Sequence, residues 1–145
     1  MLWRVIATVF FIGYFPFAPG TLVCLLCMLF LIILKPSLQM QLLILLFSFI
    51  LGIISSQKVE KKDYNKDPSY IVIDEFSGYL TSVIFHPVEL KVLVLGLIIF
   101  RVFDILKPLP IKYIEKRFKK GLSIMVDDIL AGVFANLLLR FFLML

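Results

Sequence analysis

The sequence predicts an all-α integral membrane protein, a helical bundle of about five spans with a polar site at the cytoplasmic ends of its helices. The first observation is composition: 61% of the 145 residues are hydrophobic, compared with about 45–50% in soluble domains. The mean hydropathy is +1.04, and the apolar residues lie in runs long enough to approach the span of a bilayer. The second observation is that ionisable residues recur near one end of these runs. The length predicts a single domain over residues 1–145.

Five mostly apolar runs are the expected spans: residues 22–34, 40–56, 68–85, 90–107 and 123–144. A turn is expected before the first run at residues 16–21 (PFAPGT), because two prolines and a glycine interrupt helical hydrogen bonding. Thr21 is the expected N-cap of that run. The third run is expected to begin with Asp67 as N-cap and Pro68 at the first helical position. Residues 1–18 predict either an interfacial helix or a short re-entrant segment, which could add a sixth helix.

Basic residues between the runs predict the orientation of the spans. Residues 57–66 are rich in lysine and are expected to form a solvated loop, and the connection 107–120 carries six basic residues against Glu115 alone. The positive-inside rule places both connections in the cytoplasm, because two spans separate them. The net charge of +5 therefore indicates an anionic membrane surface rather than nucleic acid. Residues 112–120 are interpreted as a topological signal rather than a clamp for substrate.

With this orientation, the polar residues of the apolar runs lie near the cytoplasmic ends of their helices. An ionisable group inside a span costs several kcal/mol, so such groups indicate a functional site. At about 1.5 Å per residue, most lie within roughly 10 Å of the interface and can converge on one shallow site. They are Thr21, Asp67, Asp74, Glu75, Arg101, Asp104, Lys107, Asp127 and Asp128.

The chemistry of this set favours a metal and a phosphate. Carboxylates packed together repel, so they need bound cations or basic partners. An oxygen-rich site near water suits Mg²⁺, which is often held by carboxylates together with substrate phosphates. Arg101 can grip two phosphate oxygens and Lys107 adds a point charge. These are the parts needed for phosphoryl transfer to water, in which a carboxylate could be either the nucleophile or the base.

Other interpretations of the same residues remain open at this point. Arg101 and Asp104 could be a structural ion pair, and Asp127-Asp128 could be the acidic first turn of the last helix. The carboxylates could also form an ion path in a small non-enzymatic, cation-handling membrane protein. A path should distribute charge over the whole depth of the bilayer, whereas the outer halves of the spans are nearly uncharged except for Arg140. Cys24 and Cys27 lie one turn apart in an apolar run and are interpreted as packing residues.

Three stretches resemble one family, the phosphatidylglycerophosphatase A family. They are FAPGT at 17–21, DPSYIVIDEFSGY at 67–79, and RVFDILKPLPIKYIEKRFKKGLSIMVDDILAGVFANL at 101–138. The resemblance implies a bacterial, Mg²⁺-dependent inner-membrane enzyme that removes the terminal phosphate of phosphatidylglycerophosphate, giving phosphatidylglycerol. A phosphatase of another phosphorylated lipid is the related alternative. The implied partner is the phospholipid substrate in the membrane, with the active site facing the cytoplasm.

The resemblance also implies roles for individual residues. The catalytic residues would be Asp74, Glu75, Asp104, Asp127 and Asp128. The residues that bind the substrate phosphate would be Arg101, Lys107 and Thr21, with Gly20 as a further candidate. The metal ligands would come from Asp67, Asp74, Glu75, Asp127 and Asp128.

Overall fold

A computed structural model describes residues 1–63, 68–118 and 121–144, and every regular element in these ranges is helical. The elements are α1 (Leu2–Ala7), the 3₁₀ helix η1 (Ile12–Tyr14), α2 (Pro19–Leu34), α3 (Leu38–Asp63), α4 (Ile73–Val83), α5 (Leu90–Leu106), α6 (Leu109–Glu115) and α7 (Gly121–Met144). The prediction of an all-α fold is confirmed for this part of the chain.

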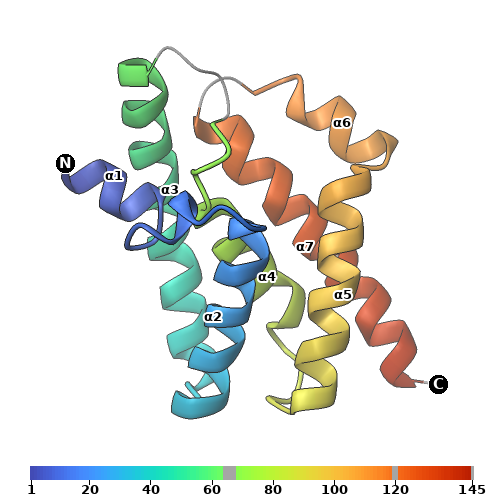
Figure 1. The fold of residues 1–145 in the computed structure, drawn as a ribbon. Helices are drawn as coiled ribbons and strands as arrows, with labels where there is room; N and C mark the ends of the chain where they lie inside the picture. The colour runs from blue at the N-terminus through green and yellow to red at the C-terminus, as the bar shows by residue number, and fades with distance from the viewer. Residues whose placement is uncertain (64–67, 119–120, 145) are drawn as a thin grey trace.

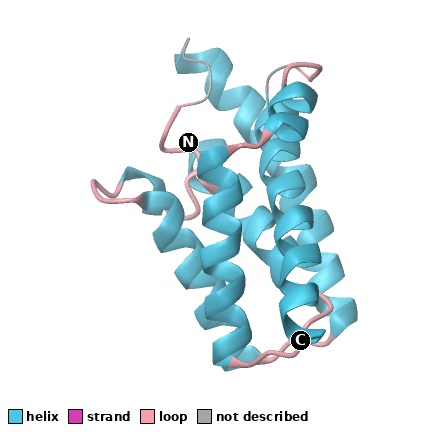
Figure 2. Cartoon of the chain, turned by 90° about the vertical axis from the view of Figure 1, so that its right-hand side faces the viewer, coloured by secondary structure: helices cyan, strands magenta, loops and turns pink. Residues whose placement is uncertain are grey.

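The short helix α4 lies at the centre of the bundle. It packs against α2, α3, α5 and above all α7, which surround it in Figure 1. Nine of its eleven residues are buried. The connections after α2 and α4 lie at the lower end of the bundle in Figure 1, whereas the end of α3, α6 and the start of α7 lie at the upper end. The view turned by 90° in Figure 2 shows the same long bundle of helices joined by loops.

Among the described residues, two helices are long and apolar enough to cross a membrane, namely α3 over Leu38–Glu60 and α7 over Gly121–Met144. In an apolar stretch of 18 residues, only 22% of the first helix and 44% of the second are buried inside the protein, so neither resembles the covered core helix of a soluble domain. Large apolar side chains such as Leu46, Phe47 and Phe141 are instead exposed. Exposed apolar surface on this scale is typical of contact with lipid. The chain therefore has the features of a membrane protein.

The other helices are shorter, so the expectation of about five complete spans is not confirmed. Helix α2 is apolar over 16 residues, and the 11 residues of α4 extend about 16 Å, roughly half of a bilayer core. The protein itself satisfies the polar backbone where α4 stops. Asn136 of α7 donates hydrogen bonds from Nδ2 to the carbonyl oxygens of Thr81 (3.0 Å) and Ile84 (2.7 Å). Before α4, the N–H of Val72 donates to the carbonyl of Ala7 (2.9 Å).

Several predicted boundaries were wrong for identifiable reasons. The loop expected from residue 57 is helical as far as Asp63, because Lys and Glu are good helix formers and continue α3. Helix α4 begins at Ile73 rather than Pro68, because residues 68–72 pack against α1 in a non-helical conformation. Thr21 is not an N-cap, because Pro19 occupies the first turn of α2 and Ala18 is the cap residue. Residue 67 lies outside the described residues.

The basic connection after α5 contains a helix that the sequence analysis did not predict. Helix α5 ends at Leu106 as Pro108 requires, and Lys107 takes a left-handed conformation with φ 41°. The short helix α6 follows at once and packs on α7. Residues 107–118 are thus an ordered part of the fold rather than a simple connection.

Candidate active site

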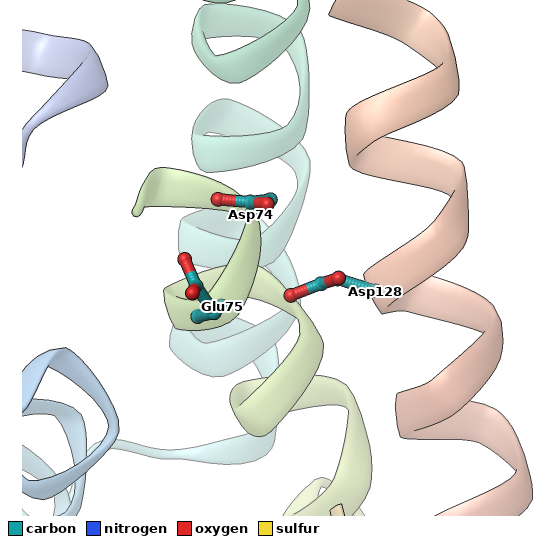
Figure 3. A group of neighbouring side chains, drawn as sticks. All are labelled: Asp74, Glu75 and Asp128. Carbon is teal, nitrogen blue, oxygen red and sulfur yellow. The ribbon is translucent and has the colours of Figure 1, made fainter. Parts of the chain in front are cut away.

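Three carboxylates meet between α4 and α7. Asp74 and Glu75 stand in the first turn of α4, and Asp128 points toward them from α7 (Figure 3). One oxygen from each side chain lies within 4.8 Å of one from each of the other two. The sequence predicted these three residues as part of one site, and the fold brings them together from positions more than 50 residues apart.

The environment of these carboxylates is poor in hydrogen-bond donors. Asp74 is 8% exposed and Asp128 only 3%. Among the described residues, no donor reaches Oε2 of Glu75 or Oδ2 of Asp128, although both atoms are buried. A buried anionic oxygen without a partner is costly, and three neighbouring carboxylates repel one another. The three carboxylates therefore suit a hard divalent cation such as Mg²⁺ as ligands, because Mg²⁺ prefers carboxylate oxygens.

Two glycines allow α4 and α7 to approach closely enough to form this cluster. Gly78 follows Asp74 by four residues and Gly132 follows Asp128 by four, so each lies one turn from its carboxylate. A Cβ atom on Gly78 would lie 2.7 Å from the carbonyl oxygen of Asp128, and one on Gly132 would collide with the carbonyl oxygen of Gly78. The close crossing of these helices thus fixes the separation of the acidic side chains.

Basic residues from α5 complete the site. Arg101 contacts Asp104 through Nη1 at 2.5 Å and lies 3.9 Å from Oε1 of Glu75. Lys107 forms an ion pair with Asp127 of α7. Asp104 and Lys107 are both close enough to Asp128 to interact with it electrostatically.

The carboxylates and the basic residues predicted from the sequence therefore form one connected cluster that joins α4, α5 and α7. Arg101 and Asp104 do form the ion pair that the sequence analysis gave as a structural alternative to a phosphate site. It is not isolated, however, since the same guanidinium also faces Glu75. The structural and functional interpretations of this pair are therefore compatible.

Helix α2 reaches the cluster through Gly20. A Cβ atom at this position would collide with Oε1 of Glu75 and lie 3.1 Å from Nη1 of Arg101, so a larger residue here would displace the Glu75 side chain. Thr21 is half-buried in the first turn of α2. The first turn of α2 thus contributes a close backbone approach, whereas the predicted contribution of the Thr21 side chain stays untested.

The structure separates the two neighbouring aspartates of α7. Asp128 belongs to the three-carboxylate cluster, whereas Asp127 is paired with Lys107. The sequence alone could not distinguish them, because adjacent helical residues differ by about 100° in direction. Asp67, a predicted metal ligand, lies outside the described residues. Cys24 and Cys27 are fully buried in the apolar core as expected, and Cys24 Sγ lies 3.7 Å from the carbonyl oxygen of Glu75.

Comparison with known proteins identifies relatives over nearly the whole chain. The family model described as Phosphatidylglycerophosphatase A matches residues 5–143. A protein of Bacteroides thetaiotaomicron named "Putative phosphatidylinositol-3-phosphatase" is 35% identical over 92% of this chain and 89% of its own length. The Phosphatidylglycerophosphatase A of Escherichia coli is 31% identical, covering 96% of this chain and 82% of that protein.

A third relative matches a shorter part of the chain. The Phosphatidylglycerophosphatase A of Haemophilus influenzae is 35% identical over 60% of this chain and 54% of that protein. No solved structure matches the chain. The family model covers every residue of the acidic and basic cluster, and the resemblance noted in the sequence is confirmed. This chain belongs to the phosphatidylglycerophosphatase A family.

Proposed function

We propose that this protein hydrolyses the terminal phosphate monoester of phosphatidylglycerophosphate, giving phosphatidylglycerol and inorganic phosphate. Membership of the family and the two relatives named Phosphatidylglycerophosphatase A support this substrate. The observation that carries the chemistry is the single cluster in which Asp74, Glu75 and Asp128 adjoin the cations Arg101 and Lys107. An ion path is not favoured, because the cluster lies at one level of the bundle.

In this proposal each charged residue has a distinct role. Asp74, Glu75 and Asp128 hold Mg²⁺, which supplies charge neutralisation at the phosphate when bound. Arg101 binds phosphate oxygens, and Asp104 fixes the orientation of its guanidinium. Lys107 adds positive charge beside the phosphate and is positioned by Asp127. Thr21 is the remaining candidate for a phosphate contact, at the start of α2.

The reaction follows from these positions. The oxygen of a water molecule forms a bond to phosphorus while the ester P–O bond breaks, and the glycerol oxygen leaves as an alcohol after taking up a proton. A carboxylate of the cluster accepts the proton that the attacking water loses. The fixed cations stabilise the charge on the phosphoryl oxygens in the transition state.

We further propose that the protein is a multi-pass protein of the bacterial inner membrane with this site facing the cytoplasm. The lysine-rich end of α3 and helix α6, which belongs to the basic connection 107–120, lie at the same end of the bundle in Figure 1, as a common cytoplasmic side requires. In this arrangement α2, α3, α5 and α7 cross the bilayer. Helix α4 lies between these four helices and ends within the protein. This agrees with the hydrogen bonds that Asn136 donates to the carbonyl oxygens of Thr81 and Ile84 at the end of α4.

A second substrate deserves a direct comparison, because one relative is named for the 3-phosphate of phosphatidylinositol. Both compounds are phosphate monoesters on a phospholipid headgroup, so the same charged cluster could serve either. The test is phosphate release by the purified protein in neutral detergent from each lipid, with Mg²⁺ and with a chelator. We expect Mg²⁺-dependent release from phosphatidylglycerophosphate at a kcat/KM well above that for the inositol lipid. The reverse preference would assign the second substrate, and no release from either would refute the phosphatase assignment.

Replacement of Arg101 by Lys is expected to lower kcat/KM by about 10²-fold, although the charge is kept. A lysine cannot contact Asp104, Glu75 and phosphate oxygens with one planar group, so a donor to the transition state is lost. The measurement is the rate of phosphate release at saturating Mg²⁺. Arg140→Lys is the matched control, because Arg140 is exposed near the far end of α7 and should tolerate the change. Equal activity of the two variants would remove Arg101 from the phosphate site.

A further inference from the structure

Helix α6 presents an unusual outer surface at the end of the bundle that carries the active site. Leu109, Lys112 and Tyr113 of this helix and its C-cap residue Lys116 are all exposed and recur at the i, i+3, i+4, i+7 spacing of one helical face. On the opposite face, Ile111 is fully buried in the apolar core and α6 packs on α7. The outer face, here called the α6 face, is thus oriented by the fold and combines apolar and basic side chains.

The exposure of the apolar members is large. Leu109 is 83% exposed and Tyr113 is 63% exposed. The guanidinium of Arg117 stacks on the Tyr113 ring, 5.0 Å from its centre, and donates a hydrogen bond to the Tyr113 hydroxyl at 3.1 Å. Aromatic and basic side chains in this combination are typical of the headgroup region of a membrane, where the ring meets apolar lipid and the cation meets phosphate.

The charge of the face selects the kind of lipid. Lys112 and Lys116 are both exposed, and neither forms an ion pair with a residue whose side chain the structure describes. Basic side chains at a membrane surface attract anionic headgroups and contribute about a fivefold gain in affinity each. A zwitterionic headgroup offers no net charge to match them. An apolar, solvent-facing helix without such a partner would be a liability for solubility.

The α6 face also follows the catalytic site closely along the chain. Lys107, which is paired with Asp127, precedes α6 by two residues, and only Pro108 separates them. A phospholipid held by α6 therefore lies beside the charged cluster rather than at a remote part of the bundle. The lysines of this segment then do more than set the orientation of the spans.

We infer that the α6 face is a binding site for anionic phospholipids of the bilayer, placed next to the active site. The phosphate of the headgroup lies against Lys112 and Lys116, and the side chains of Leu109 and Tyr113 enter the apolar boundary. The part concerning the active site rests on the proposed function, whereas lipid binding by α6 can be measured without catalysis.

The experiment uses the full-length protein with a tryptophan reporter on the face. Trp3 is the single tryptophan of the chain, so Trp3→Phe combined with Tyr113→Trp places the only indole on α6. The reporter protein is reconstituted into phosphatidylcholine nanodiscs that contain an equal mole fraction of either brominated phosphatidylglycerol or brominated phosphatidylcholine. Bromine quenches the indole on contact, so the ratio of the two quenching curves gives the relative affinity for the anionic lipid.

We expect stronger quenching by the anionic lipid, weakened by added salt. Lys112→Gln with Lys116→Gln should lower the relative affinity about 25-fold, by the fivefold contribution of each lysine. Lys91→Gln, at an exposed lysine near the opposite end of α5, is the matched control and should keep the preference. Equal quenching by both lipids, or an unchanged preference in the double variant, overturns the inference.

The outcome is separable from that of the phosphatase assay. A protein that prefers brominated phosphatidylglycerol yet releases no phosphate in detergent would retain the α6 site and lose the proposed activity. A protein that hydrolyses phosphatidylglycerophosphate but shows no lipid preference at α6 would retain the activity and lose the site.

Discussion

Replacement of Asp128 by Asn is expected to remove nearly all activity while leaving the metal-free protein at least as stable as the wild type. Asp128 is 3% exposed and lies within 4.8 Å of Asp74 and Glu75, so its charge is repelled by both in the absence of a cation. The amide of Asn has the same shape without the charge, which relieves this repulsion. Activity and stability should therefore change in opposite directions, as is common for groups placed for function.

The size of the loss follows from the role proposed for the metal. If the cation contributes about 4 kcal/mol of transition-state stabilisation, losing it lowers kcat about a thousandfold. Phosphate release measures this loss, and thermal unfolding in detergent measures stability. In the wild type, Mg²⁺ should raise Tm because it binds only the folded state, whereas the shift should disappear in Asp128→Asn.

Glu89→Gln is the control for this prediction, because Glu89 is an exposed carboxylate at the start of α5, at the end away from the cluster. It should retain activity and the shift of Tm by Mg²⁺. If Asp128→Asn kept both as well, Asp128 would not be a ligand. If, in the absence of metal, Asp128→Asn were markedly less stable than the wild type, the carboxylate would have a structural role. Its repulsion by Asp74 and Glu75 would then be offset by contacts that Asn cannot make.

The composition of the site could be predicted from the sequence because buried charge in an apolar run is costly and therefore informative. Asp74, Glu75, Arg101 and Asp104 stood out against hydrophobic neighbours, and helical spacing placed each near one end of its run. The all-helical fold followed from the same runs. The different partners of Asp127 and Asp128 depend on how α7 is rotated about its axis, and periodicity gives that rotation only within wide limits.

The remaining features depend on contacts between distant segments. Gly20 meets Glu75 across 55 positions of sequence, and no local pattern at either residue indicates the other. Helix α4 begins late because the segment before it is held at α1, where the N–H of Val72 donates to the carbonyl of Ala7, and the helix-start signal Asp67-Pro68 could not reveal this contact. Helix α6 was not predicted, because the basic residues around it were interpreted only through their charge. Local signals thus identified the chemistry, while tertiary packing determined the boundaries.

Replacement of Gly132 by Ala is expected to damage the site without changing any charged residue. The new Cβ would collide with the carbonyl oxygen of Gly78 and lie 2.9 Å from Cβ of Thr81, so α4 and α7 must move apart. Overpacking of this kind costs about 1–3 kcal/mol, against about 1 kcal/mol gained because Ala favours a helix over Gly. The clash should dominate, since a backbone carbonyl in a buried helix cannot rotate away. We expect Tm to fall by several degrees.

Activity should fall further than stability suggests, by about 10–100-fold, because Asp128 lies one turn from Gly132 and would shift away from Asp74 and Glu75. Displacements of about 1 Å in a catalytic group can cost about 10²-fold in rate. The measurements are kcat, the Mg²⁺ concentration for half-maximal activity, which should rise, and Tm in the same detergent.

Gly52→Ala is the matched control for this change, because Gly52 of α3 also faces α7 at a close crossing. Its new Cβ would meet Sδ and Cε of Met125, the far end of a flexible side chain, which can adjust more readily than a backbone carbonyl. That variant should keep its activity, its Mg²⁺ requirement and its Tm. Equal behaviour of the two variants would show that α4 and α7 tolerate a wider separation, and the close approach of Gly78 and Gly132 would then not be what sets the geometry of the carboxylates. A selective loss in Gly132→Ala would instead tie the catalytic geometry to the close approach of two backbones in the interior of the bundle.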